Sequence, residues 1–161
     1  MSLQFRRLVS AYEDQVFSLA CYLLHDRSEA EDVAQETFVK LWHRLDEINK
    51  HQAKAWLMKV TRNACLDRLR RRRPTTDISE TIAAADPGPG QSLQQQQLGE
   101  WLQRAITNLK EPYRSLVLLR DVQQNSYQDV ATTLELSLDQ VKVYLYRARR
   151  VLRERLQEVS T

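Results

Sequence analysis

Cationic and aromatic side chains gather near the C-terminal end of this sequence. Six of its 24 Lys and Arg residues fall between Lys142 and Arg155, where tyrosines are interleaved with them. Guanidinium and ammonium groups donate hydrogen bonds to phosphates and to base edges, and aromatic rings stack on bases. This combination favours contact with nucleic acid over a merely solvated face. The side chains on the outer side of the predicted helix are Lys142, Val143, Tyr144, Tyr146, Arg147, Arg149 and Arg150.

A second cationic segment lies in the first half of the chain. Eight Lys and Arg residues fall between Lys54 and Arg73, and Pro74 follows four consecutive arginines. Proline should end the helix, and cations at a helix C-terminus are electrostatically favourable. Four in a row exceed what capping needs, which favours phosphate binding. Asn63, next to Arg62 on the expected exposed side, is placed to approach a base.

Acidic side chains concentrate ahead of this basic segment. The stretch from Asp26 to Glu36 holds five acids and one base. Acids three or four residues apart on one helix face repel each other, so an uncompensated cluster indicates a cationic partner. A solvated acidic face is the alternative.

The sequence shows no arrangement of side chains that is typical of an enzyme active site. No Ser, Cys or Lys is paired with a base and an orienting group, and no glycine-rich phosphate loop occurs. We therefore expect a protein that is not an enzyme, with no catalytic residue and no cofactor.

The cysteines are too few for a disulfide scaffold. Cys21 and Cys65 are the only two, and no apolar signal segment follows the first methionine, so a reduced, cytoplasmic protein is expected. Cys21 and His25 stand one helical turn apart, and Cys65, His43 or His51 would have to complete a metal site. Small core residues are the favoured interpretation of both thiols, and no metal ligand is predicted.

The elements that must position these side chains are helices. Only three glycines and four prolines occur, and no segment alternates polar and apolar residues long enough for a strand. We predict an all-α fold of two small helical domains, residues 1–74 and 98–161. A flexible linker, residues 75–97, joins them, because it contains a Pro-Gly-Pro-Gly cluster and a glutamine run without an apolar stripe.

Apolar periodicity and capping residues predict the individual helices. In the first domain they span residues 3–24, 29–45 with Ser28 as N-cap, and 55–72, with a polar loop over 46–54. In the second, helices over 98–109 and 112–121 form a floor for a helix-turn-helix over 126–156. Ser126 caps its first helix, and Ser137 with Gln140 forms the capping box of its second.

An acidic helix, a polar loop, a basic helix, a linker and a basic helix-turn-helix occur here in a specific order. That order resembles the bacterial RNA polymerase sigma factors of the extracytoplasmic-function (ECF) group of the sigma-70 family. Three segments carry the resemblance: AEDVAQETFVKLW from Ala30, AWLMKVTRNACLDRLRRRRP from Ala55, and SYQDVATTLELSLDQVKVYLYRARRVLRERL from Ser126. It implies a non-enzymatic initiation factor that binds RNA polymerase core and promoter DNA, both duplex and single-stranded non-template strand. It also implies control by an anti-sigma factor, often membrane-anchored, without insertion of this chain into a membrane.

The resemblance implies three sets of site residues. Those facing the polymerase core are Glu31, Asp32, Gln35, Glu36, Val39 and Trp42. Those contacting the minus-ten element, where the loop over residues 46–54 would hold a flipped-out base, are Asn49, Lys50, His51, Lys54, Trp56, Lys59, Arg62, Asn63, Arg68, Arg70 and Arg71. Those contacting the minus-thirty-five element are Ser126, Tyr127, Ser137, Gln140, Lys142, Val143, Tyr144, Tyr146, Arg147 and Arg150.

Some positions depart from the family pattern or admit two interpretations. Trp56 lies on an apolar stripe, so a core role is as well supported as base stacking. Glu135 occupies a turn position usually held by glycine, so we expect a turn without free access to left-handed backbone angles. Tyr144 and Tyr146 stand where arginine or histidine is commoner, which leaves the minus-thirty-five sequence open.

Two other functions fit parts of the sequence. One is a stand-alone helix-turn-helix regulator whose N-terminal domain dimerises or senses a ligand, and which binds a palindromic duplex without polymerase. The other is a small metal or redox sensor built on the two cysteines and His25.

Overall fold

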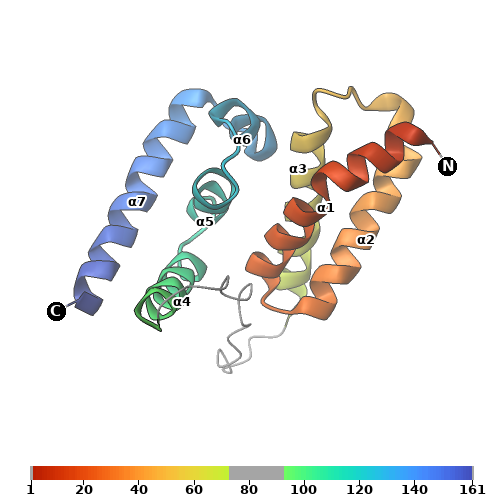
Figure 1. Cartoon of the computed structure of the whole chain (residues 1–161). Coiled ribbons are helices and arrows are strands. Elements are labelled where there is room, and N and C mark those ends of the chain that lie inside the picture. Colours follow the sequence, from red (N-terminus) through yellow and green to blue (C-terminus); the bar gives the residue numbers. More distant parts are fainter. Residues whose placement is uncertain (1, 73–92, 161) are drawn as a thin grey trace.

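The computed structural model describes residues 2–72 and 93–160, and all regular elements in these ranges are helical, which confirms the all-α class (Figure 1). The main helices are α1 (Leu3–Leu24), α2 (Arg27–His43), α3 (Ala53–Arg71), α4 (Leu93–Thr107), α5 (Tyr113–Val117), α6 (Tyr127–Leu134) and α7 (Leu138–Ser160). A short 3-10 turn, η1 (Leu45–Glu47), follows α2, and a π-helical turn, η2 (Leu118–Val122), extends α5. Among the described helices, none is both long and apolar enough to cross a bilayer.

The first three helices form a bundle in which α1 packs against both α2 and α3. Each helix turns one apolar stripe inward, and fully buried leucines such as Leu19, Leu41 and Leu57 fill the centre. The predicted N-cap of α2 is wrong by two residues. Asp26, in extended backbone, accepts a hydrogen bond from the Glu29 amide at 3.0 Å, and Ser28 lies inside the first turn. Two neighbouring residues had capping side chains, and backbone conformation decided between them.

The fourth helix begins earlier than the sequence pattern indicated. It starts at Leu93, inside the segment predicted to be linker, and the rest of that prediction, residues 75–92, lies outside the described residues. Residues 93–97 contain one leucine and four glutamines, without glycine or proline. Glutamine has good helix propensity. The glutamine run was assigned to the linker because of its low complexity, although it forms the first turn of α4.

The helix-turn-helix is formed by α6 and α7, with the predicted caps. Ser126 Oγ accepts from the Asp129 amide at 3.0 Å, and Ser137 and Gln140 exchange reciprocal side-chain bonds at 2.9 and 3.1 Å. Glu135, between the helices, adopts a left-handed conformation with φ 57° and ψ 43°. The turn therefore uses a left-handed conformation at a residue that lacks the free access of glycine to it.

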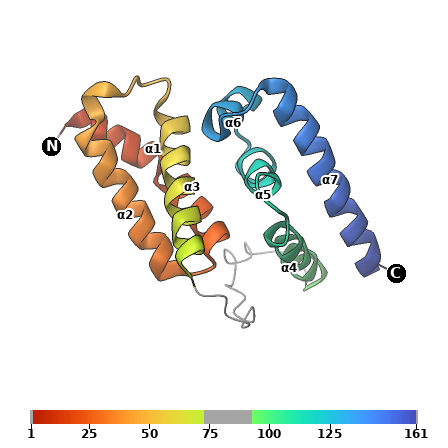
Figure 2. The ribbon, with the colours of Figure 1, turned by 180° about the vertical axis from the view of Figure 1, so that it is seen from behind.

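The two domains lie against each other, with α3 beside α6 and α1 beside η2 (Figure 2). Hydrogen bonds cross between them: Thr133 Oγ1 donates to the Ala55 carbonyl at 3.5 Å, and Gln123 Nε2 donates to the Gln15 carbonyl at 2.9 Å. Buried apolar side chains from both domains belong to one continuous cluster. The structure therefore holds the domains in one closed arrangement.

Candidate nucleic-acid interface

The acidic helix α2 presents all six predicted core-facing residues to solvent. Val39 and Trp42, one helical turn apart, are 55% and 45% exposed and form an apolar patch beside the acids. A helix with acids and large apolar groups together on its outer side favours contact with another protein.

Two of these acids are paired within the chain, so the prediction of an uncompensated acidic face is wrong. Arg27 approaches Glu31 at 3.8 Å along α2, and Arg68 Nη2 reaches from α3 to Glu36 Oε1 at 2.7 Å. Helical periodicity showed which side of α2 is polar, but it did not show that α3 places a cation beside that side.

A groove between α1 and α2 extends this face. Its volume is about 880 Å³, and Phe5 packs edge-to-face on Trp42 with ring centroids 5.1 Å apart. Apolar side chains and three acids line the groove; its lining residues are Phe5, Glu13, Asp14, Phe17, Glu31, Ala34, Gln35, Phe38, Val39 and Trp42. Sequence reasoning missed the contribution of α1, because the apolar residues of α1 gave no signal that some of them stay uncovered.

The predicted minus-ten residues divide by exposure. Those exposed on the loop and on α3 are Asn49, Lys50, His51, Asn63, Arg70 and Arg71. Those at least partly covered are Lys54, Trp56, Lys59, Arg62 and Arg68. In the loop, Asn49 Oδ1 accepts from the His51 amide at 3.1 Å, which orders the chain just before α3.

The consecutive arginines at the end of α3 have different roles. Arg70 and Arg71 pair with Asp67 of the same helix at 3.8 and 2.9 Å, and both are more than 70% exposed. Exposed pairs within a helix are weak, so these two cations are available to phosphates. Arg72 instead donates to the Leu24 carbonyl at 3.0 Å and pairs with Glu29, which ties the end of α3 to α1 and α2.

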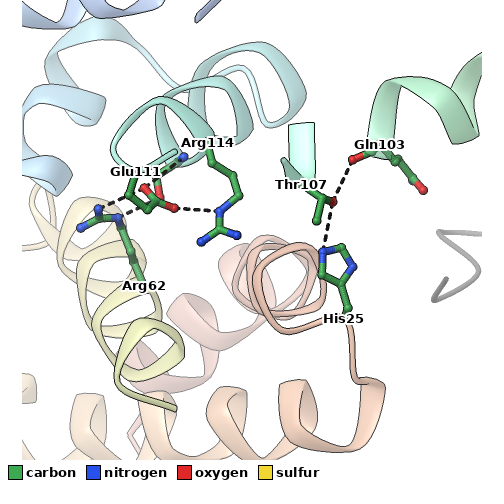
Figure 3. Close-up of polar contacts among 7 residues, drawn as sticks. His25, Arg62, Gln103, Thr107, Glu111 and Arg114 are labelled. Atoms are coloured by element: carbon green, nitrogen blue, oxygen red, sulfur yellow. Dashed lines mark hydrogen bonds and ion pairs between the residues drawn. The ribbon is translucent and has the colours of Figure 1, made fainter. Parts of the chain in front are cut away.

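Arg62 does not lie on the exposed side of α3, contrary to the prediction. Its side chain is 17% exposed, and it points into the C-terminal domain, where Nε donates to Ser115 Oγ at 2.8 Å (Figure 3). Nη2 donates to Glu111 Oε2 at 3.2 Å. Trp56, half-buried, packs against the core.

Most predicted minus-thirty-five residues form an open face on the helix-turn-helix. Ser126, Ser137, Gln140, Lys142, Val143, Tyr146, Arg147 and Arg150 are exposed. Tyr127 is half-buried, and Arg120 lies over its ring at 4.4 Å.

Two side chains of α7 that were expected to face outward contact preceding helices of the same domain. Tyr144 is half-buried and packs edge-to-face on Tyr113, with centroids 5.7 Å apart. Arg149 makes a bidentate contact to Asp121 at 3.0 and 2.6 Å, and these hydrogen bonds raise its pKa. Both contacts fix α7 against the preceding helices.

The cysteines and His25 serve packing in this arrangement. Burial raises the pKa of Cys65 to about 12 and raises that of Cys21 as well, so neither thiol is activated. His25 Nε2 lies 3.1 Å from Thr107 Oγ1 (Figure 3). Within residues 2–72 and 93–160, no group of three or more His, Cys, Asp or Glu side chains is placed to hold a metal ion.

Comparisons with known proteins match both halves of the chain to one family. Sigma-70 region 2 matches residues 8–75, and Sigma-70 region 4 matches residues 99–152. The chain is 31% identical to the ECF RNA polymerase sigma factor SigE of Mycolicibacterium smegmatis over 96% of its own length and 62% of that protein. It is 25% identical to the ECF RNA polymerase sigma factor SigW of Bacillus subtilis over 96% of this chain and 90% of that one. The chain thus spans less than two thirds of the SigE relative and most of the SigW relative.

A solved structure shares the whole-chain arrangement. The sigma factor RpoE, in a co-crystal structure with the anti-sigma factor NepR from Bartonella quintana, superposes with a TM-score of 0.76 and 25% identity. That superposition covers 97% of this chain and 98% of the other. Both domains and their relative placement are therefore similar in the two proteins.

Proposed function

The chain belongs to the ECF group of the sigma-70 family of sigma factors, and from that premise we propose that it binds RNA polymerase core and directs promoter-specific transcription initiation. The single observation that carries the proposal is the coexistence of three separate faces on matched regions. These are the exposed acidic and apolar face of α2, the polar loop with the basic surface of α3, and the open face of α7. One protein partner and two DNA elements account for all three.

The polymerase core would occupy the face of α2 and the adjoining groove. Asp32 and Gln35 are exposed there, and Trp42 stands at the end of the groove. A groove lined by apolar side chains and acids suits a helix that carries both apolar and cationic side chains. The Arg68–Glu36 pair joins this face to α3, so binding here also affects a cation of the DNA surface.

The two DNA surfaces would act on different forms of DNA. Lys142, Val143, Tyr146 and Arg147 project from the second helix of a helix-turn-helix, the element that enters the major groove. The loop before α3 and the exposed Asn63 would hold unstacked bases of the non-template strand. We assign no catalytic step to the chain, and we place its action in the cytoplasm with polymerase.

An anti-sigma factor is proposed as the negative regulator. The likeness to a sigma factor solved with NepR supports this assignment. Such a regulator would cover the core-facing surface, and it would hold the domains in the closed arrangement seen here.

Core binding gives the direct test. Purified chain is mixed with purified bacterial core polymerase, and complex formation is measured by co-elution. Asp32→Ala/Gln35→Ala should weaken the complex by about tenfold or more, because both side chains lie in the proposed contact. Glu154→Ala, an exposed acid at the far end of α7, is the matched control and should bind as wild type.

Promoter selection is tested on the same complex by run-off transcription from a template library randomised over both promoter elements. Transcripts should be enriched for one pair of sequences, and Arg147→Ala should weaken enrichment at the upstream element while core binding is kept. Tight binding to a palindromic duplex without any association with core would overturn the proposal in favour of a stand-alone regulator.

A further inference from the structure

The exposed face of α7 carries an acid near the start of the helix, Asp139, which is not among the residues predicted to contact the minus-thirty-five element. The rotation of α7 is fixed by a buried seam at helical spacing, which consists of Val141, Leu145, Ala148 and Leu152. Residues three, four and seven positions apart share one face of a helix, so the side opposite this seam carries a stripe at the same spacing. The members of this stripe are all exposed: Asp139, Val143, Tyr146 and Arg150.

Cations lie along both edges of the stripe. Lys142 is exposed at one edge and Arg147 at the other. Between them, Val143 and Tyr146 are 46% and 61% exposed. Cationic edges suit the two phosphate backbones that border the major groove, and a centre with apolar and aromatic groups suits base edges. Asp139 is therefore in line with the part of α7 that would read bases.

The fold of α7 does not use the Asp139 carboxylate as a cap. Ser137 and Gln140 bond to each other's backbone amides at 2.9 and 3.1 Å, and these two residues form the cap of the helix. To the residues that the structure describes, the Asp139 carboxylate makes neither a hydrogen bond nor an ion pair. The helix macrodipole favours an acid in the first turn, but the effect is modest at an exposed site. The carboxylate is thus free to meet a ligand of α7.

A carboxylate on this face is unfavourable unless the DNA supplies a hydrogen-bond donor to it. Phosphates repel it by charge, and the carbonyl and ring-nitrogen acceptors on the edges of guanine and thymine repel it as well. The donors that bases present in the major groove are the amino groups N4 of cytosine and N6 of adenine. An acid in line with the base-reading centre therefore indicates a base with an amino group.

Cytosine fits a carboxylate better than adenine does. An ionised carboxylate only accepts hydrogen bonds, and cytosine presents the N4 donor to the major groove without an acceptor beside it. Adenine places its N7 acceptor next to its N6 donor, a pattern that the amide of asparagine matches with both of its groups. Aspartate at this position therefore favours cytosine, and asparagine would favour adenine.

We propose that Asp139 is a specificity-determining residue of the helix-turn-helix and selects a cytosine in the duplex that α7 reads. The carboxylate accepts a hydrogen bond from cytosine N4, and it disfavours guanine and thymine at the same position. The inference rests on the proposed function for the contact between α7 and promoter duplex, and it adds a base and a residue to that contact.

The first test is the selection of duplexes by the full chain. A library randomised over about 15 base pairs, or one and a half helical turns, is bound at about 50 mM salt, and the bound duplexes are sequenced. The wild type should enrich cytosine about tenfold over guanine at one position. Asp139→Asn should lose this preference and shift it toward adenine. The absence of such a cytosine in wild-type sequences, or its persistence with Asp139→Asn, would overturn the proposal.

Glu154→Gln is the matched control for the change of charge. It neutralises an exposed acid of the same helix, about 22 Å further along. It should keep the wild-type base preference at every position. The same shift in both variants would show that charge alone sets the preference, which would overturn the proposal. A purely structural role of Asp139 would also overturn it, because Asp139→Asn would then weaken binding to all duplexes alike without changing the preferred base.

The second test removes the donor from the DNA. In the selected duplex, the cytosine is replaced by 2-pyrimidinone, which is cytosine without its 4-amino group, and affinity is measured by fluorescence anisotropy. The wild type should bind about tenfold more weakly, whereas Asp139→Ala should lose less than about twofold, because the acceptor is already absent. The same replacement at a cytosine elsewhere in the duplex is the control and should affect both proteins equally. An equal loss in both proteins at the selected position would overturn the proposal.

Neither test requires polymerase, so the outcomes are separable. A chain that selects cytosine through Asp139 but never associates with core would retain this inference and lose the proposed function. A chain that directs transcription, but whose base preference is unchanged in Asp139→Asn, would retain the function and lose the inference.

Discussion

Neighbouring arginines on α7 have different physical roles. Arg149 pairs with Asp121 of η2, whereas Arg150 is exposed and makes a long contact of 3.8 Å to Glu154. Both were predicted to lie on the outer side of α7, but only Arg150 was predicted to contact the minus-thirty-five element. Only the position of Asp121, 28 residues earlier in the chain, separates them.

We expect Arg149→Ala to change the stability of the protein and Arg150→Ala to change its binding to duplex DNA. Arg149→Ala should lower the free energy of unfolding by up to about 1 kcal/mol, because the pair is partly exposed to solvent. Arg150→Ala should keep stability but reduce the salt dependence of duplex binding by about one unit of slope. Denaturant unfolding and anisotropy titrations over a salt series measure the two effects. Loss of the slope with both variants would show that Arg149 also contacts phosphate.

His25 makes the interface sensitive to acid. Burial lowers its pKa from the ordinary value of 6.5, and the nearby charges of Arg114 and Arg72 lower it further. The unfolded chain therefore takes up a proton more readily than the folded chain does. The free energy of unfolding is therefore highest above the ordinary pKa of histidine, and it decreases as the pH falls below that value.

We expect thermal stability to fall between pH about 7.5 and pH about 5.5, and His25→Gln should reduce this fall. Thermal unfolding followed by circular dichroism at several pH values measures it. His51→Gln removes an exposed histidine and is the matched control, which should keep the wild-type pH dependence. An unchanged pH dependence in His25→Gln would contradict the assignment.

Helix ends show how far sequence reasoning reaches. The caps of α6 and α7 were predicted because Ser126, Ser137 and Gln140 act within three residues of the amides that they bond. Asp26 and Ser28 are both good capping residues, and the choice between them depends on the left-handed end of α1 at His25. The type of capping residue could therefore be predicted from the sequence, but the residue at which α2 begins could not.

The corrected cap of α2 can be tested directly. Asp26→Ala should lower the free energy of unfolding by about 1 kcal/mol, since it removes the acceptor for the Glu29 amide. Ser28→Ala, at an exposed site two residues away, should change it by less than about 0.5 kcal/mol. Chemical denaturation of the full chain compares them. A larger effect at Ser28 would restore the original prediction.

At the scale of an element, α3 carries contacts that no local pattern predicts. Lys59 and Arg62 look like exposed cations of an amphipathic helix, yet their partners are 76 and 49 residues away. The apolar stripe predicted the helix and its inward side. Which solvent-facing side chains a second domain would cover required the tertiary arrangement.

At the scale of the molecule, the two regions share one apolar cluster and a polar interface. The sequence predicted two domains and their helices, but nothing in it indicated that they close on each other. Closure depends on surfaces that meet only after each domain has formed.

We expect calorimetric unfolding of the wild type to show a single transition, because the interface couples the domains. The variant Glu111→Gln/Glu135→Gln should unfold in two transitions or over a broader range. Glu154→Gln/Asp139→Gln should behave as wild type. Two separate transitions in the wild type would mean that the interface contributes little to its stability.

Glu135 also has a consequence for related sequences. A glycine there would ease the bend between the two helices and would at the same time remove the carboxylate that reaches Lys59. At this position, a low backbone strain in the turn and an ion pair between the domains therefore require different residues. The identity of this residue in a relative, read together with the residue that corresponds to Lys59, should therefore show which relatives can form this ion pair between their two domains.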